Sequence, residues 1–155
     1  MTLANYTRSI RTKSNPTAVY RALTSGFRDW WTIPDRPIGR VGDRAKFAFP
    51  PRLSHWTFEA TALQPDERVE LTCVDAFHLH DELPKEIERE WLGTRAIWTI
   101  EPEPDGTRIG FEHVGLNPAL LCYDVCAAGW DFFFVDSLRT YLDTGKGQPH
   151  RDPTV

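Results

Sequence analysis

The sequence has few of the features that mark secreted, membrane-spanning or nucleic-acid-binding proteins. Its three cysteines, Cys73, Cys122 and Cys126, form no Cys-x-x-Cys pair, and their odd number is a poor match to a secreted disulfide framework. No run approaches the roughly 18 apolar residues that a bilayer-spanning helix needs. The first ten residues lack the apolar stretch of a secretory signal. We therefore expect a cytoplasmic protein without membrane insertion.

Positive charge is also scarce. The 18 Lys and Arg residues are outnumbered by 22 Asp and Glu, which gives a net charge of −4. This balance argues against a nucleic-acid partner. The chain has no repeat, no low-complexity tract and no internal linker, so we expect one domain over residues 1–147 and a flexible tail over 148–155.

Aromatic side chains are abundant. Six Trp, nine Phe and four Tyr make up 12% of the chain, a heavy share for a core of this size. Such a set either fills a wide core or lines a cavity.

The first part of the chain predicts a strand followed by two short helices. Residues 3–12 have the composition of a strand, and Asn15 and Pro16 are suited to the N-cap and first position of a helix. A second short helix is predicted to begin at residues 24–25. Prolines and glycine at 34–39 rule out further helix there.

The middle of the chain alternates apolar and polar residues with a period of two, which is typical of antiparallel strands. The alternating segments are 41–49, 56–60, 69–73, 91–100 and 107–116. The acidic segment 75–90 interrupts this pattern, and we expect a mobile loop with a helical turn. A solvated surface is favoured over a lid for this loop.

A long helix is predicted to begin at Asn117-Pro118 and to end at Gly145. Its apolar residues recur every three or four positions, so this stripe should face the sheet. The stripe comprises Ala127, Trp130, Phe134, Leu138 and Tyr141.

Several local patterns accompany this order of elements. They are Pro16-x-x-Val19-Tyr20-x-Ala22-Leu23-Thr24 with Trp30-Trp31, Gly93-Thr94 before Trp98, Gly106-Thr107 before Phe111-x-His113-x-Gly115-Leu116, Gly129-Trp130, Ser137-Leu138 and Tyr141-Leu142-x-Thr144-Gly145. Together they resemble the bacterial proteins similar to the activator of heat-shock-protein-90 ATPase, a branch of the START-like SRPBCC superfamily, over residues 5–147.

The resemblance implies an α+β helix-grip fold, in which a curved antiparallel sheet of six to seven strands surrounds the long C-terminal helix. It also implies a hydrophobic cavity between sheet and helix, where we expect a small hydrophobic or aromatic molecule to bind. A polyketide cyclase-like, aromatase-like or hydrolase-like enzyme using the same cavity is one alternative. A co-chaperone-like interaction module is another, less favoured because the Asn-rich, Trp-containing motif of the eukaryotic activator is missing.

The predicted ligand-binding residues combine the aromatic side chains with two polar ones. They are Trp30, Trp31, Phe47, Phe49, Trp56, Phe58, Trp98, Phe111, His113, Trp130, Phe134 and Ser137. The alternative for the rings is a packed core. The alternative for His113 and Ser137 is a hydrogen bond to protein groups, which is the more common role of such side chains.

No metal, cofactor or catalytic residue is assigned from the sequence. His78 and His80, flanked by Asp75 and Asp81, resemble metal-ligand material but lack a third and fourth ligand. His113 is the only candidate general acid or base that we can place at the cavity.

The cysteines and the assembly state complete these expectations. Cys122 and Cys126 are expected to be buried free thiols, because a disulfide between them would strain a helix. A homodimer is an open alternative that would use exposed surface at Trp91 and near Phe77.

Overall fold

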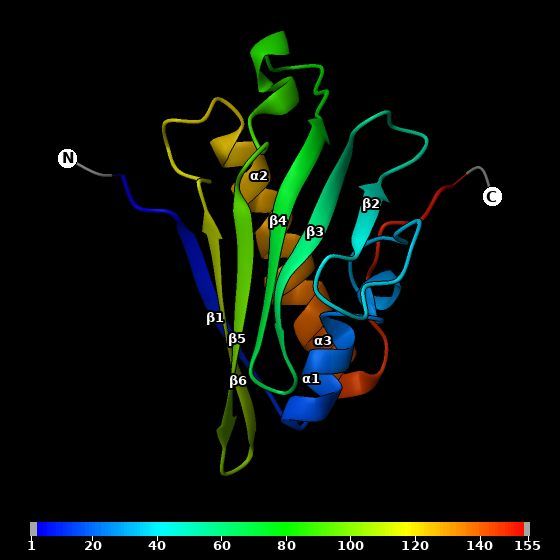
Figure 1. Cartoon of the computed structure of the whole chain (residues 1–155), viewed down its shortest axis with the longest axis vertical. Helices are drawn as coiled ribbons and strands as arrows, with labels where there is room; N and C mark the ends of the chain where they lie inside the picture. The colour runs from blue at the N-terminus through cyan, green and yellow to red at the C-terminus, as the bar shows by residue number, and fades with distance from the viewer. Residues whose placement is uncertain (1–2, 154–155) are drawn as a thin grey trace.

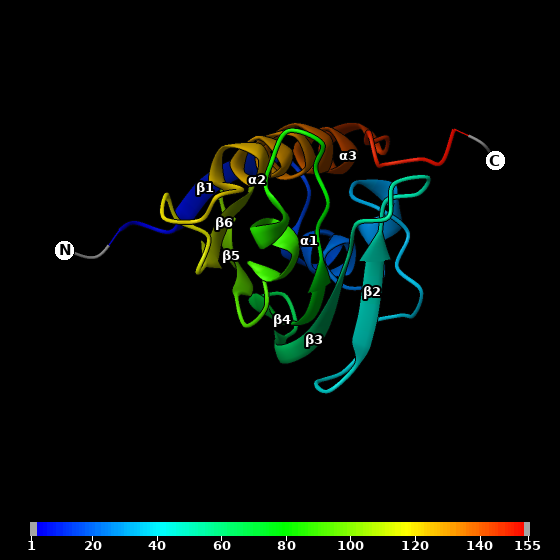
Figure 2. The same ribbon diagram turned by 90° about the horizontal axis from the view of Figure 1, so that it is seen from above.

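A six-stranded antiparallel sheet curves around a long C-terminal helix in the computed structural model, which describes residues 3–153 (Figures 1 and 2). The spatial order is β1-β6-β5-β4-β3-β2, so the first strand pairs with the last. The strands are β1 (Tyr6–Thr12), β2 (Arg44–Ala48), β3 (His55–Gln64), β4 (Arg68–Phe77), β5 (Arg95–Glu103) and β6 (Gly106–Val114). The helical segments are α1 (Pro16–Ala22), η1 (Phe27–Asp29), η2 (Lys85–Arg89), α2 (Tyr123–Trp130), η3 (Asp131–Leu138) and α3 (Arg139–Thr144). The predicted α+β helix-grip fold is confirmed.

The start of α1 follows the predicted capping. The Asn15 side-chain oxygen accepts a hydrogen bond from the Ala18 N–H at 2.8 Å, and Pro16 occupies the first helical turn. The second short helix is the single 3₁₀ turn η1, which begins at Phe27 instead of residues 24–25.

Period-two alternation gives each strand one buried face. In β6, Ile109, Phe111 and His113 are buried, while the residues between them are only partly covered. Register shifts between β3 and β4 at Thr57/Phe58 and Ala60/Ala62 add local bends that help the sheet to curve.

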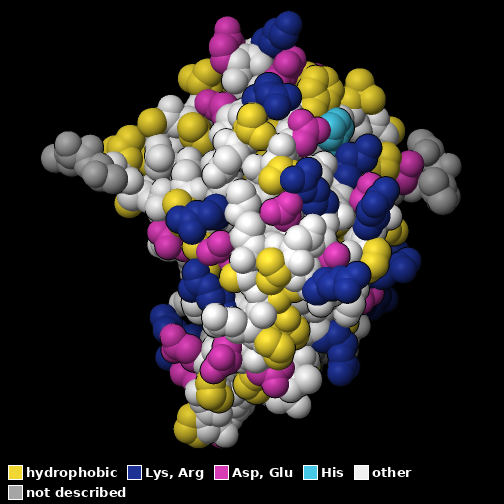
Figure 3. Space-filling view, viewed as in Figure 1, with side chains coloured by type: hydrophobic (Ala, Val, Ile, Leu, Met, Phe, Trp, Pro, Cys, Tyr) yellow, Lys and Arg dark blue, Asp and Glu magenta, His cyan; other side chains and the backbone are white. Residues whose placement is uncertain are grey.

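The outer face of the sheet carries mixed charges. Figure 3 shows Lys and Arg side chains interspersed with Asp and Glu over this face. Arg44 pairs with Glu59 at 2.8 Å, and Arg95 lies 3.5 Å from Glu70. Such exposed pairs contribute only about 0–1 kcal/mol each, so the buried apolar face supplies most of the stability.

The long helix begins later than the sequence predicts and contains an irregular middle. Asn117 does not start it, because its side chain accepts from the Ala119 N–H at 2.9 Å and closes a local turn. Regular helix begins at Tyr123, and η3 is a π-helix, a form that apolar spacing alone does not separate from an α-helix. Gly145, with a φ of 84°, ends the helix as predicted.

Two further expectations require revision. The 75–90 segment is not a free loop throughout, because β4 extends to Phe77 and the 3₁₀ turn η2 buries Ile87. Trp91 is buried, with 6% of its surface exposed, so it offers no exposed dimer surface. At the predicted tail, the Gln148 N–H donates to Ser137 Oγ at 2.7 Å and the His150 N–H donates to the Trp31 carbonyl at 2.7 Å.

Within residues 3–153, none of the helices combines the length and the apolar character that crossing a bilayer requires.

Candidate ligand-binding site

A cavity of about 160 Å³ lies between the long helix and the segments around β3, β4 and η2. Its lining comprises Trp31, Phe49, Arg52, Ser54, Trp56, His78, Leu79, His80, Trp91, Val125, Cys126, Gly129, Trp130 and Phe133. Aromatic rings contribute the largest part of this wall. The helix contributes Trp130 and Phe133 to this wall together with two small residues, Cys126 and Gly129.

The aromatic walls are fixed by contacts among themselves. The ring centroids of Trp31 and Trp130 are 4.9 Å apart, and those of Trp56 and Trp91 are also 4.9 Å apart. Trp91 and Trp130 lie nearly parallel, with an interplanar angle of 7° and a centroid separation of 6.0 Å. Rings packed in this way hold the cavity open without a bound molecule.

Three nitrogen atoms of cavity-lining side chains are buried without a hydrogen-bond partner. They are Trp56 Nε1, Trp91 Nε1 and His78 Nδ1. The Trp91 N–H is near enough to the Cys126 sulfur to favour its thiolate, but it meets no hydrogen-bond geometry. Buried polar groups are almost always paired, and three of the five unpaired side-chain nitrogens among the described residues line this one cavity.

Four of the twelve predicted residues line this cavity, namely Trp31, Phe49, Trp56 and Trp130. The other predicted rings, Trp30, Phe47, Phe58, Trp98, Phe111 and Phe134, belong to the hydrophobic core and do not line it. Trp98 and Phe111, for example, stack with centroids 4.8 Å apart and an interplanar angle of 11°. For these six rings the packed-core alternative describes the structure, and the cavity is correspondingly small.

His113 is fully buried within a hydrogen-bond network and does not line the cavity. Its Nε2 lies 2.8 Å from Thr94 Oγ1, which itself donates to the Trp91 carbonyl at 2.6 Å. Thr94 has only one hydroxyl proton, so His113 Nε2 must be the donor in that pair. His113 Nδ1 accepts from Trp130 Nε1 at 3.0 Å, which fixes a neutral imidazole. Burial lowers the pKa of His113 to about 3, and its role in the structure is to position the Trp130 ring.

Ser137 is also engaged by the protein. Its hydroxyl donates to the Trp30 carbonyl at 2.7 Å and accepts from the Gln148 N–H at 2.7 Å. The side chain therefore joins the long helix to η1 and to the C-terminal segment, and it does not line the cavity.

A cluster of two thiols and an imidazole adjoins the cavity. The Cys126 thiol donates to Cys122 Sγ at 2.7 Å, and one ring nitrogen of His78 lies within 4.8 Å of both sulfur atoms. The hydrogen bond from Cys126 lowers the pKa of the Cys122 thiol, and the same contact together with burial raises the pKa of Cys126. Both cysteines are buried free thiols, as predicted.

The other predicted metal candidates are separated from this cluster. His80 Nδ1 accepts from the Glu82 N–H at 3.1 Å, and Asp75 pairs with Arg89 at 3.6 Å. His78 and His80, to which the sequence assigns no metal, therefore have different surroundings. The partners of His78 come from the helix start, 44 and 48 residues later in the chain.

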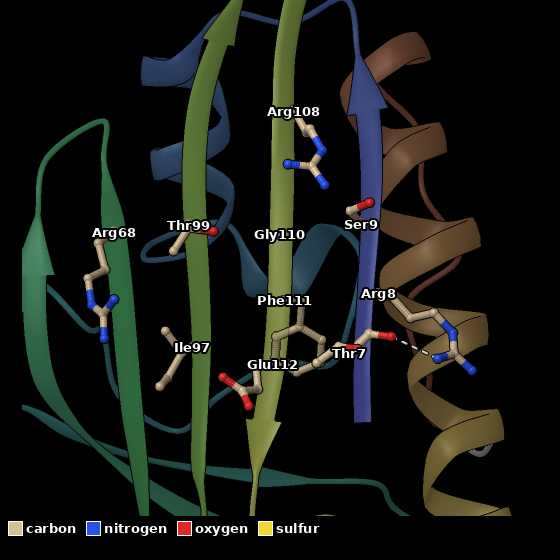
Figure 4. Close-up of a pocket in the computed structure, with 10 residues that line it drawn as sticks. All are labelled: Thr7, Arg8, Ser9, Arg68, Ile97, Thr99, Arg108, Gly110, Phe111 and Glu112. Atoms are coloured by element: carbon tan, nitrogen blue, oxygen red, sulfur yellow. Dashed lines mark hydrogen bonds between the residues drawn. The ribbon is translucent and has the colours of Figure 1, made fainter. Parts of the chain in front are cut away.

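A larger hollow, about 590 Å³ in volume, lies on the outer face of the sheet over β1, β6 and β5 (Figure 4). It forms over Gly110, where a Cβ atom would stand 2.7 Å from Thr99 Oγ1. Figure 4 shows Arg8 directed toward the long helix, where it pairs with Asp131 at 3.0 Å. Each of the three arginines in its lining is paired with a carboxylate. This open, charge-balanced surface encloses no apolar ligand, so the cavity is the better candidate site.

A comparison with protein families identifies the chain. The family described as "Activator of Hsp90 ATPase homolog 1-like protein" matches residues 13–143. The chain belongs to this family. None of the curated proteins compared with it gives a match.

Solved structures of this activator-like fold extend over nearly the whole chain. The Aha1 dimer from Colwellia psychrerythraea is 27% identical, and the alignment covers 94% of this chain and 100% of that one with a TM-score of 0.74. DynU16, from the dynemicin biosynthetic locus, is 17% identical and covers 91% of this chain and 48% of its own at a TM-score of 0.69. CalU16 from Micromonospora echinospora is 16% identical, and the alignment covers 95% of this chain and 84% of that one with a TM-score of 0.58. The last two likenesses concern the fold alone.

Proposed function

We propose that this activator-like protein binds a small aromatic molecule carrying an oxygen acceptor in the cavity beside α2. The observation that carries the proposal is the set of three unpaired buried nitrogens, Trp56 Nε1, Trp91 Nε1 and His78 Nδ1, around an aromatic-lined space. An indole N–H can only donate, so the occupant must supply an acceptor. A carbonyl, phenol or carboxylate oxygen meets that need.

The volume limits the occupant to about one ring. Sites for drug-sized ligands enclose about 300–1,000 Å³. The cavity here has about 160 Å³, and an apolar cavity of about 150 Å³ holds a benzene-sized molecule. A lipid or a multi-ring polyketide would require the side chains around the cavity to move apart.

Gly129 provides a direct test. It lines the cavity, and a Cβ atom built on it meets nothing within 4 Å. Gly129→Leu should therefore block the cavity with little strain. Ala128→Leu is the matched control, because Ala128 is exposed on the same helix and does not line the cavity.

The probes are phenol, benzamide and toluene, followed by ligand-detected NMR and tryptophan fluorescence. We expect phenol and benzamide to bind the wild type and Ala128→Leu and to lose binding in Gly129→Leu. Toluene offers no acceptor, so it should bind roughly tenfold more weakly, since the lost hydrogen bonds contribute about 1 kcal/mol each. Equal binding to the two leucine variants, or no binding to the wild type, would contradict the proposal.

The assembly state is a separate proposal. The Colwellia relative is a dimer, and this chain exposes Leu53, Leu79 and Phe132, with Leu79 at the cavity and Phe132 packed on the cavity residue Phe133. We propose that this apolar surface joins two copies of the chain. Sedimentation velocity should give a dimer that Leu53→Glu converts to a monomer, and a monomeric wild type would contradict this.

A further inference from the structure

The cluster formed by His78, Cys122 and Cys126 adjoins the cavity, and of its members only His78 also belongs to the ligand contacts proposed above. One ring nitrogen and two sulfur atoms lie within 4.8 Å of one another, and the three side chains are 6%, 0% and 6% exposed, respectively. Within residues 3–153, no other group of three His, Cys, Asp or Glu side chains converges in this way. Imidazole nitrogen and cysteine sulfur are the ligands that zinc prefers.

Rigid backbone holds all three side chains in place. His78 follows the end of β4, and its backbone N–H donates to the Glu88 carbonyl at 3.0 Å. Cys122 is the residue before α2, and the Cys126 N–H donates to the Cys122 carbonyl at 2.8 Å in the first helical turn. The ligand atoms thus come from two segments that are fixed independently of any ion. Such preorganisation is what a metal site requires.

The imidazole of His78 is not fully paired, an observation that it shares with the ligand proposal above. Although His78 is more than nine-tenths buried, its Nδ1 has no hydrogen-bond partner. His113, by contrast, pairs both of its ring nitrogens, with Thr94 and Trp130.

We propose that His78, Cys122 and Cys126 bind one divalent ion of the zinc class, with the fourth coordination position open to the cavity. Two thiolates and a neutral imidazole around a divalent ion carry no net charge, which suits a buried site. His78 and Cys126 are part of the cavity wall, so an ion between them is reached from the cavity. Three protein ligands with one open position are typical of zinc sites that meet a small molecule.

Only a small rearrangement of the thiols is needed. A tetrahedral ion about 2.3 Å from each sulfur sets the sulfur atoms about 3.8 Å apart. They now lie 2.7 Å apart, so the ion would separate them by about 1 Å, a shift within reach of the cysteine side chains. The thiol protons leave to solvent as the ion binds.

Neighbouring groups complete the surroundings without competing for the ion. The Glu90 carboxylate accepts the N–H groups of Leu121 and Cys122 at 2.9 and 3.0 Å, so it fixes the helix start. Outer contacts of this kind commonly orient metal ligands.

The test uses the full-length protein, reduced and stripped with a chelator, and then given Zn²⁺ or Co²⁺ alone. The wild type should bind one ion per chain, and the Co²⁺ form should show thiolate charge-transfer absorption. Cys122→Ser and Cys126→Ser should each weaken binding at least tenfold and reduce that absorption. Cys73→Ser is the matched control, because Cys73 is also buried but lies outside the cluster.

A second measurement on the unaltered chain guards against variants that fail to fold. Zn²⁺ should slow alkylation of Cys122 and Cys126 more than that of Cys73, because stabilisation of the fold protects every buried thiol whereas coordination protects only the two ligands. Equal protection of all three thiols, binding that survives both serine variants, or a Cys122–Cys126 disulfide in the freshly isolated protein would each overturn the proposal. The test needs no aromatic ligand, so its outcome is independent of the proposed binding function.

Discussion

The buried imidazole of His113 should make the stability of the protein fall steeply in mild acid. Its Nε2 donates to Thr94 and its Nδ1 accepts from Trp130, so protonation of Nδ1 would break the second hydrogen bond and bury a charge. Burial lowers the pKa of His113 from 6.5 to about 3 in the folded chain. Below pH 6.5 the unfolded chain therefore binds a proton that the folded chain does not, and folding loses stability as the pH falls toward 3.

The magnitude follows from the gap between the two pKa values. Each pH unit inside that gap costs about 1.4 kcal/mol of unfolding free energy. From pH 6.5, where the unfolded imidazole is half protonated, to about pH 4.5 the folded chain therefore loses about 2 kcal/mol. This is a large share of the roughly 5–15 kcal/mol by which a domain of ordinary stability is folded.

Urea unfolding at a series of pH values measures the effect. His113→Gln keeps an acceptor and a donor but does not titrate, so the wild type should lose about 2–3 kcal/mol more than this variant between about pH 7 and pH 4.5. Thr94→Val is the control: it removes the hydroxyl and costs about 1–3 kcal/mol at every pH, but keeps the titrating ring. Parallel curves for the wild type and His113→Gln would refute a neutral, buried imidazole.

The remaining predictions concern single positions. Gly129→Ala should raise the unfolding free energy by about 0.5–1 kcal/mol, measured by urea unfolding, because glycine is a poor residue within a helix and its Cβ position is free. Ser137→Ala should cost about 1–3 kcal/mol and should speed amide exchange at Gln148, whose N–H loses its acceptor. Gly106→Ala should cost more than Gly42→Ala in thermal unfolding: both glycines have positive φ, of 152° and 97°, but a Cβ at Gly106 would collide with a backbone carbonyl whereas the one at Gly42 meets nothing within 4 Å. Equal losses for the two glycine variants would show that the positive φ alone sets the cost and that the collision at Gly106 adds nothing.

The strands and the first helix could be predicted because the physics that fixes them is local. Alternation marks a strand with one buried face, and the Asn15-Pro16 pair supplies both the cap and the first helical residue. The start of the long helix could not be predicted in this way. Asn117 satisfies a local turn as readily as a helix cap, and the choice depends on Glu90, which caps the chain at Leu121 and Cys122 from a distant segment.

The hydrogen-bond partners of buried polar side chains were harder to predict than the burial of the aromatic rings. His113 shares a strand face with Phe111, and this placed it correctly in the interior. Its partners, Thr94 and Trp130, are 19 and 17 residues away, and no pattern indicates that they use both of its ring nitrogens. The sequence predicts that such a side chain is buried. Whether it is paired or free depends on tertiary contacts.

The place of the cavity follows from side-chain size along the long helix. Cys126 and Gly129 are three residues apart and line the cavity, whereas Phe134 and Leu138 fill the core farther along the helix. A stripe that begins with small residues and continues with large ones leaves its empty volume at the small end. The number of aromatic residues in the sequence could not predict the position of the cavity, because aromatic rings line cavities and fill cores alike. The empty volume depends on small residues of the helix, and Cys126 and Gly129 supply them beside the rings that line the cavity.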